Sequence, residues 1–185
     1  MLDDAHATGV LGPGGAGTLE HFGLAGRVPV LMGTLGKALG SVGGFIAGSR
    51  DLVDVLARSA RSFLFTTSLP PAAAAAALTS LRILRAEPER VERLWENARL
   101  LHAGLVDLGH DVPPAAAPIT PVFLHDDQVA AQASRVLFDR GVVAQAIGTP
   151  YVPAGTARLR LISSAAHEPS DIEAMLDAFA ALASY

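Results

Sequence analysis

Short apolar runs alternate with amphipathic helical segments along the chain, and this alternation limits the folds open to it. Residues 28–33, 45–47 and 158–162 have the apolar character of buried strands. Residues 50–61 and 87–108 instead repeat apolar side chains at helical spacing. Strands separated by helices favour an α/β fold with a largely parallel first sheet.

The remaining elements follow from local signals. Residues 63–67 are predicted to form a strand ending in hydroxyls, and two prolines at 70–71 open a predicted helix over 68–85. Further on, the sequence predicts strands at 119–124 and 142–147, a helix at 127–140, and a last helix capped by Ser170 that ends near residue 183. The pattern changes within the long helix, so we expect two domains, 1–90 and 91–185, the second a small α+β domain.

Composition excludes several classes of protein. The 185 residues contain no cysteine, which rules out disulfides, cysteine nucleophiles and thiolate metal sites. The net charge of −4 gives no electrostatic reason to expect nucleic acid or an acidic membrane as a partner. The first residues lack the features of a signal peptide, and the most apolar stretch, 70–84, contains Arg82. We expect a cytoplasmic protein.

Two glycine-rich segments superficially match nucleotide-binding motifs. Residues 12–17 have the spacing G-x-G-x-x-G, but polar residues precede them and Lys37 stands near the position where that motif needs an acidic side chain. Gly36 and Lys37 resemble part of a phosphate-binding loop, but Leu31 and Ala38 occupy two of its essential positions. The first segment is interpreted as a flexible turn, and the second match is rejected.

Lys37 lies in an apolar, glycine-rich turn directly after a predicted strand. Desolvation of such a lysine frees its amine as a nucleophile, and glycines allow the backbone to approach a flat cofactor. Thr34, three residues earlier, has a hydroxyl suited to a phosphate. The alternative is that Lys37 is an ordinary solvated loop residue.

Asp3 and His6 form a second polar group close to the start of the sequence. Further ligands at metal-site spacing are not evident, so no metal is predicted. A carboxylate that keeps a pyridine nitrogen protonated, with an imidazole that donates to a phenolic oxygen, is the arrangement that pyridoxal phosphate needs. The alternative interpretation is surface polarity.

Arg158 and Arg160 alternate along a predicted strand and therefore point to one face of it. A guanidinium has the fork geometry that binds a carboxylate through two hydrogen bonds. An ion pair at a sheet edge is the alternative for these two residues.

Taken together, these segments resemble one family. The chain contains DDAHATGVLG, GTLGKALGSVGG, FLFTTSLPP, VPAGTARLRL and SAAH in this order, at residues 3–12, 33–44, 63–71, 152–161 and 164–167. The order and the motifs resemble the α-oxoamine synthases, pyridoxal-phosphate-dependent acyltransferases of fold type I. The resemblance covers roughly the C-terminal half of a family member, so residues 1–90 are expected to be part of the cofactor-binding large domain.

The resemblance implies a role for each matching residue. Lys37 matches the lysine that bonds covalently to the cofactor, Asp3 the carboxylate at the pyridine nitrogen, and His6 the histidine near the phenolic oxygen. Thr34 matches a phosphate-binding hydroxyl. Thr67 matches the hydroxyl that reaches the phosphate of a neighbouring subunit, which implies a homodimer when the protein is complete.

The resemblance also implies the substrates. Arg160 matches the ligand of the amino-acid carboxylate, with Arg158 the weaker candidate. The expected reaction joins L-alanine to a pimeloyl thioester, carried by coenzyme A or a carrier protein, with loss of CO₂, as in biotin biosynthesis. Tyr151 stands where biotin-pathway members often have threonine, and is expected to contact the acyl substrate. Glycine with acetyl coenzyme A, or a truncated piece without catalysis, are the alternatives.

Overall fold

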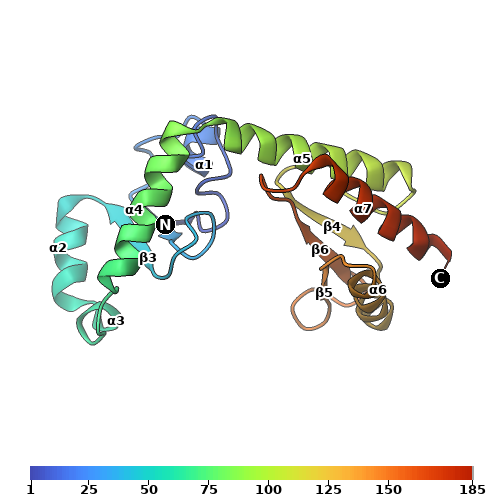
Figure 1. Cartoon of the computed structure of the whole chain (residues 1–185). Helices are drawn as coiled ribbons and strands as arrows, with labels where there is room; N and C mark the ends of the chain where they lie inside the picture. The colour runs from blue at the N-terminus through green and yellow to red at the C-terminus, as the bar shows by residue number, and fades with distance from the viewer. Residues whose placement is uncertain (185) are drawn as a thin grey trace. The chain divides into compact units, whose positions relative to one another are not determined.

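The computed structural model describes residues 1–184 and divides into two compact units, Met1–Val91 and a second that begins at Glu92. Helix α5 (Glu89–Asp107) contains the boundary between them (Figure 1). Gly109 follows this helix with a φ of 81°, a left-handed conformation that glycine adopts without steric cost and that commonly ends helices.

The first unit is built on a three-stranded sheet in the order β1-β2-β3. Strand β1 (Leu2–Asp3) pairs parallel with β2 (Val30–Thr34), so that Asp3 lies beside Met32. Strand β3 (Gly44–Gly48) returns antiparallel to β2. The prediction of a largely parallel sheet is therefore correct for β1 and β2 only, because the turn at 35–43 reverses the chain directly instead of crossing over through a helix.

Four helices complete this unit. The short α1 (Thr18–His21) lies in the crossover between β1 and β2. After β3 come α2 (Arg50–Ser59), α3 (Arg61–Leu64) and α4 (Pro71–Ala86). The side chain of Ser49 accepts a hydrogen bond from the Leu52 N–H at 3.3 Å, so the predicted N-cap of α2 is confirmed.

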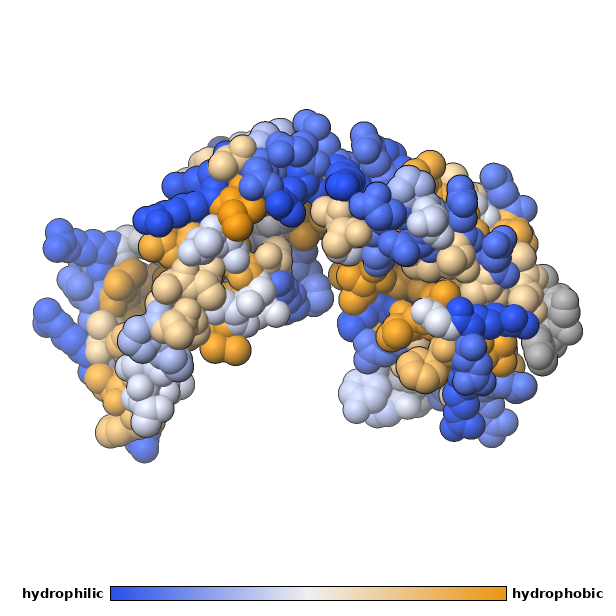
Figure 2. All heavy atoms as spheres, in the orientation of Figure 1, coloured by the Kyte–Doolittle hydropathy of each residue, from blue (hydrophilic) through white to orange (hydrophobic). Residues whose placement is uncertain are grey.

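The strands of this unit are much less buried than their apolar sequences predicted. Within β2 only Gly33 is buried, and Ile46 in β3 is 40% exposed. The buried apolar residues of the unit are few and mostly small: Ala5, Ala7, Leu39, Ala77 and Val91. Apolar side chains accordingly reach its surface (Figure 2). The apolar side chains of β2 and β3 are thus only partly covered by packing within the first unit.

The predicted strand at 63–67 is wrong. Its first residues form α3, and the following residues are irregular up to the start of α4, with Ser68 at a φ of 72°. Phenylalanine and threonine favour strands, but a strand also needs a neighbouring backbone, and here the contacts are local. Phe65 N donates to Arg61 O at 3.0 Å, which turns the backbone, and the Arg61 guanidinium lies 5.6 Å from the centre of the Phe65 ring.

The second unit packs helices against an antiparallel sheet. Strands β4 (Ile119–Phe123), β6 (Arg158–Ile162) and β5 (Gln145–Ile147) are ordered β4-β6-β5. Its helices are the greater part of α5, α6 (Asp127–Asp139) and α7 (Pro169–Ala180), with a final 3₁₀ turn at Ala181–Ser184. The core contains side chains of all three helices, among them Leu105, Leu137 and Phe179, each with no exposed surface. Figure 1 shows α7 running beside α5. The Leu176 side chain of α7 lies close to Gly104 of α5.

The turn between β6 and α7 corrects the predicted cap of the last helix. Helix α7 begins at Pro169, with Glu168 as its N-cap, because a proline has the backbone angle of a first helical residue. The Glu168 N–H donates to the Asp171 carboxylate at 2.9 Å. Ser170 therefore lies inside the helix instead of capping it.

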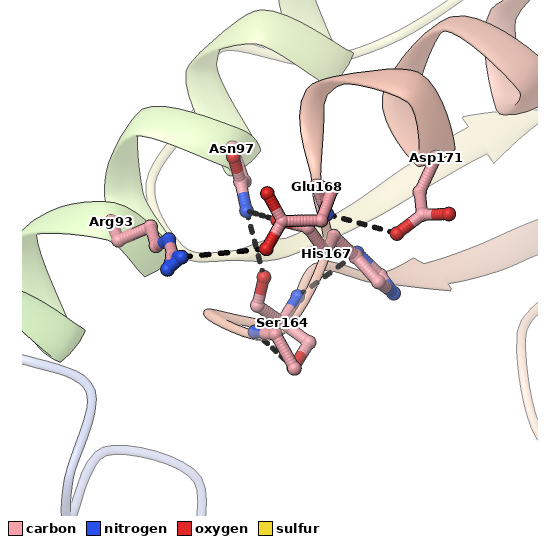
Figure 3. Close-up of polar contacts among 7 residues, drawn as sticks. Arg93, Asn97, Ser164, His167, Glu168 and Asp171 are labelled. Carbon is pink, nitrogen blue, oxygen red and sulfur yellow. Dashed lines mark hydrogen bonds and ion pairs between the residues drawn. The ribbon is translucent and has the colours of Figure 1, made fainter.

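Helix α5 holds this turn through Asn97, which is buried (Figure 3). The Asn97 side-chain amide donates to the carbonyl oxygens of Ser164 and His167, both at 2.9 Å. Arg93 lies 3.5 Å from the Glu168 carboxylate. The SAAH motif thus has a structural task, which is to fix the start of α7 against α5.

Leu137→Ala is expected to lower the free energy of unfolding of the second unit by about 2–5 kcal/mol, because it leaves a cavity in the core. Val129→Ala, on the same helix but 50% exposed, is the control and should cost under about 1 kcal/mol. Urea unfolding followed by the fluorescence of Trp95 measures both. Equal losses would show that Leu137 does not belong to the core.

Candidate functional site

The parallel pairing of β1 and β2 brings the predicted chemical groups of the first unit to one edge of its sheet. Asp3 is the last residue of β1, and Thr34 is the last residue of β2. Lys37 follows three residues later in the turn. The carboxyl ends of parallel strands meet at the same edge, which is where open α/β sheets bind ligands.

Lys37 is the only lysine in the chain. Its side chain is exposed, so the desolvation expected from the apolar sequence of its turn is not found in this chain. The turn is closed by backbone bonds from Leu35 N to Gly43 O at 2.9 Å and from Ser41 N to Leu35 O at 2.8 Å. The context of Lys37 made it a candidate in the sequence analysis. A count of lysines is the stronger sequence signal, because it leaves one possible side-chain amine.

The Thr34 hydroxyl forms hydrogen bonds to both ends of the turn that contains Lys37. Its hydroxyl accepts a hydrogen bond from Gly36 N at 3.1 Å and donates to the Gly43 carbonyl at 3.2 Å. The Ser41 hydroxyl donates to Ala73 O of helix α4 at 2.7 Å. These side chains therefore shape the loop that presents the amine.

Asp3 and its neighbour Asp4 have opposite environments. Asp3 is exposed, and one of its carboxylate oxygens accepts from Ala5 N at 2.9 Å, which turns the chain after β1. His6, at the end of that turn, is also exposed. Asp4 is 1% exposed, and its carboxylate accepts from Thr18 N at 3.2 and 3.3 Å. The sequence analysis missed Asp4, which anchors the glycine-rich segment.

Carboxylate side chains of the chain itself hold the glycine-rich segment 9–17 in place. Glu20 accepts from the backbone N–H groups of Gly14 and Ala16, both at 3.0 Å. Gly17, beside the Asp4 carboxylate, has a φ of 104° and a ψ of −164°, a conformation essentially restricted to glycine. The segment is thus an internally bonded crossover and not the strand-to-helix turn of a dinucleotide site.

In the second unit, β6 presents its two arginines on the face opposite to the core. Leu159 and Leu161 are buried, and the intervening Arg158 and Arg160 are half-buried. Arg158 is engaged: its guanidinium donates to Thr156 O and Thr156 Oγ1 at 2.9 and 3.0 Å and lies 4.5 Å from the Phe123 ring centre. Arg160 donates to Gln145 Oε1 at 2.5 Å, and its buried Nε has no hydrogen-bond partner among the described residues.

The two remaining predicted residues are both exposed. Thr67 lies in the irregular segment between α3 and α4. Tyr151, 87% exposed, lies in the loop between β5 and β6. The structure therefore groups Asp3, Thr34 and Lys37 at one sheet edge, and groups Arg158 and Arg160 on one strand face. Within residues 1–184, no cluster of side chains suited to a metal ion is found.

Comparison with known proteins identifies the class. The family of class I and II aminotransferases matches residues 1–179, and the chain belongs to this family. The resemblance to the α-oxoamine synthases is confirmed by relatives named 8-amino-7-oxononanoate synthase, from Fervidobacterium nodosum at 50% identity and from Methylococcus capsulatus at 52%. Each alignment covers 97% of this chain, and 45% and 47% of the relative.

Solved structures confirm the α/β fold expected from the sequence. A serine palmitoyltransferase structure with a pyridoxal phosphate internal aldimine has a TM-score of 0.93 at 38% identity, over 98% of this chain and 46% of that one. The 8-amino-7-oxononanoate synthase of Francisella tularensis has a TM-score of 0.84 at 25% identity, over 99% and 54%. The chain thus spans about half the length of these proteins. Among its described helices, none is long and apolar enough to cross a membrane.

Gly17→Ala is expected to destabilise the first unit, because the added methyl group would lie 1.9 Å from an Asp4 carboxylate oxygen. Gly23→Ala is the control for a positive φ without a neighbour: its φ is 64°, and no atom lies within 4 Å of the added group. We expect Gly17→Ala to cost at least about 2 kcal/mol and Gly23→Ala about 1 kcal/mol. Chemical denaturation followed by circular dichroism measures both, and equal costs would argue against the Asp4 anchor.

Proposed function

We propose that the chain serves a pyridoxal-phosphate-dependent acyltransferase of the α-oxoamine synthase type. The reaction joins L-alanine to a pimeloyl thioester with loss of CO₂ and gives 8-amino-7-oxononanoate, a step of biotin biosynthesis. The observation that carries the proposal is the single lysine, held at the sheet edge that also carries Asp3. The names of relatives about 50% identical support the choice of substrates.

The groups at the sheet edge fit this cofactor. They comprise the exposed carboxylate of Asp3, the hydroxyl of Thr34 and the amine of Lys37, and the imidazole of His6 follows Asp3 in the next turn. Pyridoxal phosphate, when bound, supplies a pyridinium ring that withdraws electrons from the α-carbon of an amino acid. A carboxylate, an amine and a phosphate-binding hydroxyl are the groups that this chemistry requires of a protein.

Each residue then has one task. The amine of Lys37 would hold the cofactor, and the same amine would act as the base that takes the proton from the α-carbon of the amino acid. The Asp3 carboxylate would keep the ring nitrogen protonated, and His6 would donate to the phenolic oxygen. Thr34 would contact the phosphate, for which its hydroxyl has to release the Gly43 carbonyl oxygen that it bonds in this structure. Thr67 would contact the phosphate of the partner in a homodimer.

Arg160 is proposed to bind the carboxylate of the amino acid. A buried guanidinium nitrogen without a partner is costly to desolvate, and an incoming carboxylate satisfies it with a charge-assisted hydrogen bond. Arg158 is less suited, because its donors already bond to Thr156. Tyr151 is proposed to contact the acyl substrate.

Reduction with borohydride in the presence of pyridoxal phosphate is expected to attach one cofactor to the peptide that contains Lys37. Peptide mass spectrometry measures the adduct. Lys37→Arg keeps the positive charge but is not nucleophilic, so it should lose the adduct completely. An adduct confined to the N-terminal amine would contradict the assignment.

Arg160→Ala is expected to raise the Kd for L-alanine roughly 30- to 150-fold in the cofactor-loaded protein, which corresponds to about 2–3 kcal/mol. Arg158→Ala, two residues away on the same strand, is the matched variant and should raise it less than about threefold. Spectral titration with L-alanine measures both values. Equal weakening would mean that both arginines share the carboxylate.

A further inference from the structure

The loop at 148–157 is tethered at both ends by one short turn. This turn, residues 125–127, joins β4 to α6, whereas the loop joins β5 to β6 and carries Tyr151. At the start of the loop, Thr149 N donates to both carboxylate oxygens of Asp127, at 3.3 and 3.2 Å. At its end, Nδ1 of His125 lies 3.1 Å from the Gly155 carbonyl oxygen. A carbonyl oxygen only accepts, so Nδ1 is the donor.

The His125 side chain, which is 61% exposed, makes two further contacts that orient its ring. Its Nε2 lies 2.9 Å from the Asp111 carboxylate, and the ring stacks on Phe123 with centres 5.9 Å apart. His125 has a φ of 64°, which is uncommon for any residue other than glycine. Such a conformation persists where its neighbours over-determine it, and it concentrates at functional sites.

The 125–127 turn and the 148–157 loop also approach each other closely. A Cβ atom on Gly148 would lie 2.6 Å from Asp127 Oδ1, so the close approach at the start of the loop requires a glycine there. Asp126, between the two tethering residues, caps α6 and accepts from Gln128 N and Val129 N at 2.8 and 3.0 Å. The cap holds the intervening residue, so His125 and Asp127 stay at fixed positions on either side of it.

Building on the proposed function, we propose that His125 and Asp127 are positioning residues that fix the 148–157 loop so that it presents Tyr151 to the acyl substrate. Tyr151 takes little part in packing, as its 87% exposure shows. The loop leads directly into β6, and Arg158 bonds to Thr156 at its end. A loop ordered before binding loses less conformational entropy when the ligand arrives, which favours affinity.

His125→Gly tests the tether without adding strain, because glycine accepts the positive φ and removes the ring contacts with Gly155 and Asp111. In the full chain, amide hydrogen exchange measured by NMR should accelerate on the order of tenfold within the loop, at Thr149, Tyr151, Val152 and Thr156. Asp127→Ala should accelerate exchange most strongly at Thr149. Asp127→Asn keeps an acceptor oxygen and should restore its protection.

His102→Gln is the control for loss of a histidine–carbonyl bond, since His102 Nε2 lies 2.8 Å from Pro113 O, outside the loop. It should leave exchange in the 148–157 loop unchanged. Two outcomes would overturn the tether: unchanged loop exchange in His125→Gly, or an equal acceleration in β4 and β6, which would mean general destabilisation.

Titration with pimeloyl coenzyme A tests what the tether is for. Tyr151→Ala and His125→Gly should each weaken its binding on the order of tenfold relative to the parent chain. Unchanged affinity in a variant with a loosened loop overturns the positioning role. A parent chain that does not bind this thioester overturns the proposed acyl substrate and the role of Tyr151 together, whereas the exchange data decide on the tether independently.

Discussion

The contact between the buried Asp4 carboxylate and the backbone of Thr18 is the interaction on which the lysine site depends. Parallel strands such as β1 and β2 need a long crossover between them, and here much of that crossover is glycine-rich chain. Such chain has a high entropic cost of ordering. Asp4 and Glu20 reduce the freedom of this segment by bonding its N–H groups, which lets a two-residue strand keep Asp3 in register with Met32.

The second unit depends on a different constraint, the two-residue period of β6. Leu159 and Leu161 anchor the strand in the core, so the arginines between them must face away from the helices. Within that face the two arginines are not equivalent. Arg158 is held by Thr156 and Phe123, whereas Arg160 retains a buried nitrogen without a partner. One strand therefore combines core packing with a guanidinium that keeps a buried donor unpaired among the described residues.

The sequence predicted what depends on local pattern and missed what depends on distant partners. The Ser49 cap, the start of α4 at a proline and the positions of β2, β3 and β6 followed from neighbouring residues. The prediction of a strand at 63–67 was wrong because side chains that favour strands do not by themselves provide a second strand for the backbone to pair with. Asp4 and His125 were not recognised, because their partners Thr18 and Gly155 are distant in sequence. Only Lys37 carried a compositional signal, its uniqueness.

That uniqueness has a consequence for chemical selectivity. Lysine and arginine together number 14, and all but Lys37 are arginines. Guanidinium groups stay protonated near neutral pH, so they do not compete for carbonyl electrophiles such as aldehydes and thioesters. The chain thus carries its positive charge almost entirely in an inert form. Within these 185 residues a reactive carbonyl compound finds a single side-chain amine, at the edge of the sheet where the parallel strands end.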